Sequence, residues 1–181
     1  MPFFISSLFI NWNMKSTSSL IVMLCILSLP ESAGAQNEVL REINSLYGIR
    51  SFGVAVNVEK PLSLDHMEFR IQPIQNALVK KLAQLPIEGI ADEELQDSDQ
   101  YPMLILHINI MDAGNGTYPY ATDLTFYQPV KLSLNRDLGT MAATWQTALV
   151  GIVSADNMQV IPNTSIALTD EFIQDYLKAN L

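Results

Sequence analysis

The side chains able to do acid–base or metal chemistry are few, and their spacing forms no catalytic pattern. The two histidines, His66 and His107, are not spaced as a pair of metal ligands. The acidic segment 92–99 lacks the glycine and the terminal glutamate of a calcium-binding EF-hand loop, and no nucleophile elbow or phosphate-binding glycine loop occurs elsewhere. The sequence therefore predicts no catalytic residue, no metal site and no cofactor.

One group of residues is typical of a binding surface. Segments 104–110 and 124–134 alternate apolar with polar residues, which indicates two β-strands. If helices cover the apolar face, the opposite face presents neutral polar side chains around an aromatic ring, a mixture that suits protein recognition. The predicted binding patch consists of His107, Asn109, Thr125, Tyr127 and Lys131. The alternative is an ordinary solvated sheet face, which antiparallel sheets often have.

The elements that must position this patch follow from hydrophobic periodicity. Apolar residues at steps of three and four predict three helices, and alternation predicts the strands. The expected helices cover 37–47, 67–85 and the C-terminus from Thr169, and the expected strands cover 52–58, 104–110, 124–134 and 141–153, with a short strand near Gly89. Pro73 predicts either a bend in the second helix or a regular helix that starts near it.

The order of these elements predicts an α+β fold. The last three strands are joined by turns too short for helical crossovers, so they should pair antiparallel. Each has one apolar face that the helices can cover. We expect a two-layer sandwich, with a mainly antiparallel sheet of about five strands and with the long helix and the C-terminal helix packed on one face.

The N-terminal segment predicts export. Lys15, an apolar run over 20–29 and the small residues Ala33-Gly34-Ala35 form a secretory signal peptide, which we place at Met14–Ala35 with translation starting at Met14. Residues 1–35 are then leader and signal, and residues 36–181 form a single domain. The apolar run is about half as long as a membrane span. We therefore expect a periplasmic or extracellular protein without a stable membrane anchor after cleavage.

Composition narrows the possible partners and chemistry. The formal net charge is −9, and an acidic protein repels the phosphates of nucleic acid, so nucleic acid is not expected as a partner. The single cysteine, Cys25, lies inside the predicted signal. The domain from Gln36 onward has none, which excludes disulfides, thiol catalysis and cysteine-ligated zinc there.

Three segments carry a resemblance to a known family. They read QPVKLSLNRD over 128–137, TWQ over 144–146 and FIQDYLKAN over 172–180. These segments resemble the Q-x-V-x-L strand, the T-W strand and the F-I-x-D-Y-L-x-x-N terminal helix of an uncharacterised family of small secreted bacterial proteins. The element order is also similar to the TolB N-terminal domain and to curli-transport lipoproteins. The resemblance implies no activity and no site residue, because fold does not imply function.

Three hypotheses about function remain open. The first is an exported, non-enzymatic binding or assembly module of the bacterial cell envelope, with an envelope protein as its partner. The second is a small secreted hydrolase or ligand-binding protein with a pocket of unrecognised type. The third is a structural envelope component, which self-association would distinguish. The sequence predicts no particular oligomeric state.

Overall fold

The computed structural model describes residues 33–65, 69–89 and 101–181. His66, Cys25, the acidic segment 92–99 and most of the predicted signal lie outside these residues. The chain divides into two units, Met1–Asn37 and Glu38–Leu181, and the second contains the sheet and its helices. In chain order the helices and strands are α2 (Ala33–Ser45), β1 (Ser51–Glu59), α3 (Ile71–Leu82), β2 (Glu88–Gly89), β3 (Met103–Ile110), β4 (Thr117–Lys131), β5 (Gly139–Ser154) and α4 (Val160–Asn180).

The strands form one mixed sheet in the order β2-β1-β3-β4-β5. Four of them are long, and the two-residue β2 adds to the outside of β1. β1 runs parallel to β3, its neighbour across the connection that carries α3, whereas the pairs β3–β4 and β4–β5 are antiparallel. The predicted α+β class is confirmed, and the three long strands joined by short turns pair antiparallel as expected.

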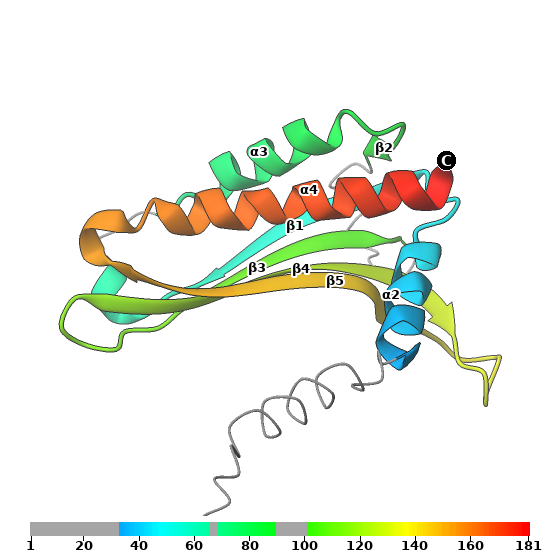
Figure 1. Ribbon diagram of the computed structural model, residues 1–181, viewed down its shortest axis with the longest axis horizontal. Coiled ribbons are helices and arrows are strands. Elements are labelled where there is room, and N and C mark those ends of the chain that lie inside the picture. Colours follow the sequence, from blue (N-terminus) through cyan, green and yellow to red (C-terminus); the bar gives the residue numbers. More distant parts are fainter. Residues whose placement is uncertain (1–32, 66–68, 90–100) are drawn as a thin grey trace, which may run out of the picture. The chain divides into compact units, whose positions relative to one another are not determined.

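One face of the sheet carries α3 and α4, which lie side by side along it (Figure 1). α3 turns Ile74, Leu78 and Leu82 inward at steps of four, and all three are buried. Lys81 on α3 donates to Asp170 on α4 at 2.6 Å, which ties the two helices together at the surface. An exposed pair of this kind contributes little stability, so the helices are held mainly by their buried apolar faces.

An aromatic cluster joins the sheet to α4 in the centre of the core. The ring of Phe172 is fully buried, and its centroid lies 5.6 Å from Phe52, 5.6 Å from Phe126 and 5.1 Å from Trp145. These separations are in the range where aromatic pairs attract each other beyond simple area burial. The Tyr176 hydroxyl, one turn further along α4, donates to Ile49 O at 2.6 Å and so fixes the chain just before β1.

The position of Pro73 resolves the alternative left open for the second helix. α3 starts at Ile71, with Arg70 as its N-cap, so Pro73 occupies the third helical position. The first four N–H groups of a helix have no intrahelical acceptor, and a proline there removes no hydrogen bond. The expectation that the regular helix starts near Pro73 is therefore confirmed. Of the expected span 67–85, residues 67–68 lie outside the described part of the chain, and residues 69–70 and 83–85 are not helical.

The C-terminal helix is longer than predicted, and the expected start at Thr169 is wrong. α4 begins at Val160, and Pro162 sits in its first turn. The hydroxyls of Thr164 and Ser165 donate to backbone carbonyls of the preceding turn, at Val160 and Ile161. Residues of this type favour turns in isolation, so the segment does not look helical in the sequence, but burial of one face overrides that preference.

The strand β4 differs from the prediction at both ends. β4 begins at Thr117, earlier than the expected residue 124, because Tyr118 and Tyr120 are buried on the covered face. It ends at Lys131, so Leu132 and Leu134, which were expected to face the core, lie beyond the strand with exposures of 44% and 101%.

A β-bulge marks the middle of the β4–β5 pair. The register shifts between Phe126 and Tyr127, which makes Thr144 the extra residue of β5. The carbonyl of Thr144 accepts a hydrogen bond from Ser45 Oγ at 3.0 Å, at the end of α2. A bulge strengthens the local twist and redirects the side chains that follow it.

Candidate functional site

The second face of the sheet is the candidate site, because neither α3 nor α4 covers it (Figure 1). We call it the open face. The register places alternate residues of the four long strands on it, since side chains on a strand alternate between the two faces. On β3 these residues are intermediate or exposed, whereas their neighbours Leu104, Leu106 and Ile108 are buried under the helices.

The structure brings together the predicted residues of β3. His107 is half-buried and pairs across the sheet with Asp123 on β4 and with Asn57 on β1. Asn109, two residues further on the same face, is exposed and donates from Nδ2 to Glu59 Oε2 at 3.1 Å. The open face at this point offers a mixture of amide, imidazole and carboxylate groups suited to hydrogen bonding with a protein partner.

Two further predicted residues lie beside them on β4. Thr125 is on the open face but only 4% exposed, and its hydroxyl donates to Asp123 Oδ2 at 3.0 Å. It therefore positions Asp123 rather than presenting a free hydroxyl. Tyr127 is half-buried and pairs with Met103 at the start of β3. A partly exposed tyrosine can supply both apolar contact area and a hydroxyl at an interface.

Lys131 does not belong to this group. It is the last residue of β4, four residues beyond Tyr127, and pairs with Gly139 rather than with β3. Four residues of extended strand span about 13 Å, so its exposed ammonium group stands away from the other predicted residues. The predicted residues are therefore spread along the open face: His107, Asn109 and Thr125 lie within a few residues of one another, whereas Tyr127 lies six residues along the ladder from Asn109, about 20 Å, and Lys131 further still.

The sequence reasoning missed an apolar part of the open face on β5. Val150 is 82% exposed and Ile152 is 71% exposed, and both point away from the helices. Their cross-strand neighbours on β4 are the small residue Ala121 and the half-buried Pro119. A signal was present, since residues 139–154 contain no charged side chain at all.

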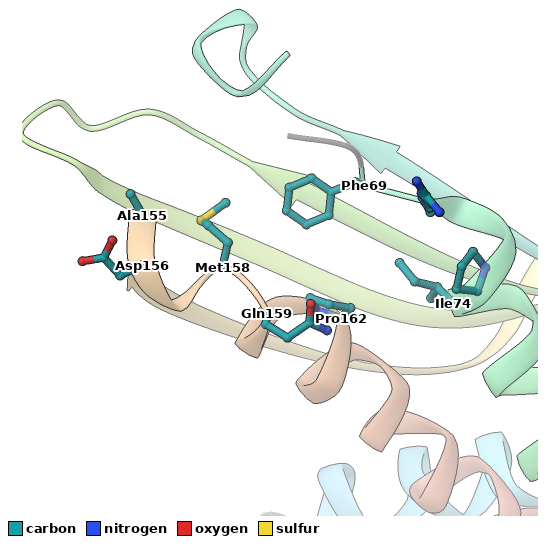
Figure 2. A pocket seen from close by; sticks show the side chains of 9 residues that line it. Phe69, Ile74, Ala155, Asp156, Met158, Gln159 and Pro162 are labelled. Carbon is teal, nitrogen blue, oxygen red and sulfur yellow. The ribbon is translucent and has the colours of Figure 1, made fainter. Parts of the chain in front are cut away.

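A second candidate site is a pocket of about 500 Å³ between the first turns of α3 and α4. Figure 2 shows Phe69 and Met158 facing the same space from the two sides. The polar lining groups are Arg70, Asp156 and Gln159. Pockets of this size hold small molecules. No sequence pattern pointed to it, because its walls come from segments far apart in the chain.

Three groups with displaced pKa values lie away from the pocket. Burial, reinforced by Glu38 and then Asp175, raises the pKa of Glu42. The Ser63 hydroxyl, followed by the Gly114 N–H, lowers the pKa of Asp112. Burial also raises the pKa of Tyr176. Each shift has a structural cause at a turn or between packed helices, so none of these groups points to a catalytic centre.

The described residues hold neither a cluster of metal ligands nor a helix that could cross a membrane. Within 33–65, 69–89 and 101–181 no three histidine, cysteine, aspartate or glutamate side chains gather closely enough to hold a metal ion. None of the helices in those ranges has the length and apolar character needed to cross a membrane.

Comparison with known proteins adds no relative. The chain matches no protein-family model and none of the curated proteins. The resemblance to small secreted bacterial proteins therefore stays a prediction, and the candidate sites stand on geometry alone.

Proposed function

We propose that this protein is an exported binding or assembly module of the bacterial cell envelope, and that the open face is its working surface. The observation that carries the proposal is the asymmetry of the sheet. The helices α3 and α4 lie on one face, while the other presents His107, Asn109 and Tyr127. An aromatic ring beside amide and imidazole groups on an uncovered face matches the composition of protein interfaces.

The chemistry of the open face favours a protein partner. Its exposed groups are mostly neutral hydrogen-bonding side chains beside apolar ones, which matches the composition of protein interfaces. The net charge of −9 disfavours nucleic acid and anionic lipid. Recognition without chemistry is also consistent with the predicted lack of a catalytic group.

A photo-cross-linking experiment in the host cell tests the binding surface. A photoreactive amino acid at Asn109 should give one discrete adduct with an envelope protein, and the adduct should weaken in a Tyr127→Ala background. The same amino acid at Gln174, an exposed position on α4, is the matched control. Adducts of equal intensity at both positions, or none at Asn109, would contradict the assignment of the open face.

Export is tested separately. N-terminal sequencing of the protein recovered from its host should find Gln36 as the first residue, because the predicted signal is cleaved after Ala35. A protein that retains its N-terminus and stays inside the cell would contradict the envelope proposal without bearing on the binding face.

The pocket supports a second candidate, a small-ligand-binding protein. Its apolar walls with Arg70 and Asp156 at the margin suit a small molecule with an apolar body and a polar end. Native mass spectrometry of the protein from its host should then show a bound species that is lost in Ala155→Trp, which fills the pocket. An unliganded mass in both proteins would argue against this candidate.

A further inference from the structure

The outer edge of β5 is the most unusual surface of the described chain. β5 is the last strand of the sheet order, and no described strand pairs with its outer side. It is 16 residues long and contains neither a charged residue nor a proline. Natural proteins usually protect such an edge with charges, prolines, bulges or a covering segment, since an open edge pairs readily with another strand.

The direction of the backbone groups on this edge follows from the register. Ala155 N–H donates to Gly116 O at 3.2 Å, so this pair is one of the hydrogen-bonded pairs of the antiparallel ladder. Hydrogen-bonded and non-hydrogen-bonded pairs alternate along such a ladder. Beyond the bulge, the residues of β5 whose N–H and C=O groups point outward are therefore Gln146, Ala148, Val150, Ile152 and Ser154.

The same residues place their side chains on the open face. Val150 and Ile152 are the most exposed apolar side chains of the strand, at 82% and 71%. Within the described residues, the edge is protected at its other end, where the bulge residue Thr144 accepts the Ser45 hydroxyl at 3.0 Å. From Gln146 to Ser154 no described segment satisfies the outward backbone groups.

We propose that this edge pairs with the same edge of a second copy, antiparallel and about a two-fold axis at Val150. The two sheets then become one continuous sheet through about ten new backbone hydrogen bonds. Val150 meets its own copy, and Ala148 lies opposite Ile152, so that a small side chain faces a large one. Gln146 and Ser154 close the seam at its ends with uncharged polar groups.

The lack of charge on β5 permits a second copy to pair there despite the net charge of the chain. Two molecules of net charge −9 repel each other over most of their surface, so a stable contact between them requires an uncharged seam. The edge of β5 provides one, because residues 139–154 carry no charge. A partner selected for its charge would find nothing on this strand to recognise.

The helix above the edge leaves room for the second copy. Glu171 accepts a hydrogen bond from Thr147, and Thr164 contacts the Tyr120 hydroxyl, so this side of α4 lies over the β4–β5 pair. Between them Ala167 is exposed, and it is one turn from each. A small residue at the level of Val150 allows the two copies of α4 to approach without a clash.

Val150→Lys tests the seam, with Leu134→Lys as the matched control. Both positions are highly exposed, at 82% and 101%, so neither change should disturb the fold. Sedimentation equilibrium of the protein purified from its host should give a dimer for the wild type and for Leu134→Lys, and a monomer for Val150→Lys with an unchanged circular dichroism spectrum. A monomeric wild type at about 0.1 mM, or a dimeric Val150→Lys, would overturn the proposal.

Disulfide trapping tests the register. In a Cys25→Ser background, Val150→Cys should oxidise to a covalent dimer, because directly opposed residues have Cα atoms about 5.5 Å apart. Ile152→Cys should stay monomeric under the same oxidant, since the two copies of residue 152 would lie about 13 Å apart. Equal cross-linking of both variants, or linkage of Val150→Cys to a different protein, would refute pairing about Val150. The proposal goes beyond the partner-binding face and does not depend on it.

Discussion

Gly151 is the position where adding a single methyl group should cost most on β5. A Cβ atom built there would lie 2.6 Å from Cε1 and 2.7 Å from Cζ of Tyr120, its cross-strand neighbour on the covered face. Carbon atoms in favourable contact are about 3.5–4.0 Å apart, so the ring would have to move by about 1 Å. Tyr120 is 6% exposed and its hydroxyl lies 3.2 Å from Thr164 Oγ1, which leaves little room for that movement.

The net cost of Gly151→Ala is the difference between two effects. Overpacking a well-filled core costs about 1–3 kcal/mol. Replacing glycine by alanine in a strand returns about 0.5–1 kcal/mol through the lower entropy of the unfolded chain. Because the approach is closer than 3.0 Å and the ring is buried, the overpacking cost should lie in the upper part of its range, about 2–3 kcal/mol, so we expect Gly151→Ala to lower the free energy of unfolding by about 1–2.5 kcal/mol, or about 2–10 °C in Tm for a chain of this size.

Urea denaturation followed by circular dichroism measures this change, with Gly139→Ala as the matched control. A Cβ atom at Gly139 meets only Val130 O at 3.8 Å, an ordinary contact, so the control should be neutral or slightly stabilising. A double-mutant cycle with Tyr120→Leu should show that most of the cost of Gly151→Ala disappears once the ring is gone. An equal cost in both backgrounds, or none in the wild type, would refute the close approach of Tyr120 to Gly151.

Three further predictions concern groups whose pKa the fold displaces. The folded pKa of Glu42 is raised, chiefly by burial and then by Glu38. The stability that Glu42 contributes is therefore present below the unfolded pKa of about 4.5 and lost as the pH rises. Glu42→Gln should raise Tm at pH 7 but not at pH 3. Burial raises the folded pKa of Tyr176, so the stability that this group contributes is lost as the pH rises above 10. Tyr176→Phe should lower the free energy of unfolding by about 1 kcal/mol at pH 7, because the hydrogen bond to Ile49 is missing, and this loss should shrink as the pH is raised from 9 to 11 in urea unfolding. The folded pKa of Asp112 is lowered, chiefly by the Ser63 hydroxyl at 2.6 Å, so the stability that Asp112 contributes is present above pH 3.8 and lost as the pH falls. Ser63→Ala should move the pKa of Asp112 back toward 3.8 in an NMR titration. An unchanged pKa would exclude that hydrogen bond as the cause.

Elements with one strict period were predictable from the sequence. The strand expected over 104–110 is observed as Met103–Ile110, because every second residue from Leu104 to Ile110 is apolar and that set is buried, whereas the other set contains His107 and Asn109. The start of α4 was not predictable. Pro162 and the hydroxyl residues after it have low helix propensity, and only packing against the sheet makes that segment helical.

The candidate site was predictable in part for similar reasons. The alternation on β4 correctly separates the covered face from the open one, and it places Tyr127 and Thr125 on the latter. It cannot show that Thr125 is buried there, because that depends on side chains of neighbouring strands. The edge of β5 required the strand order, and the pocket required the distance between two helix starts, neither of which a single sequence contains.

The two proposed surfaces can be separated experimentally although they share one sheet. Tyr127 pairs with Ala143, on one side of the bulge at Thr144, whereas Val150 lies on the other. Tyr127→Ala should therefore weaken partner capture without changing the mass of the dimer. Val150→Lys should abolish the dimer; because Ala121 joins Val150 and Asn109 in one row across the sheet, its effect on the partner is read from an adduct at Lys131, on the Tyr127 side of the bulge, which should remain. If two copies do pair along β5, their open faces become continuous. A partner with repeated epitopes would then bind the dimer more tightly than it binds two separate copies, because the second contact is intramolecular. Loss of capture in Val150→Lys for such a partner, together with normal capture of a single epitope, would show that pairing of the edges serves binding on the face.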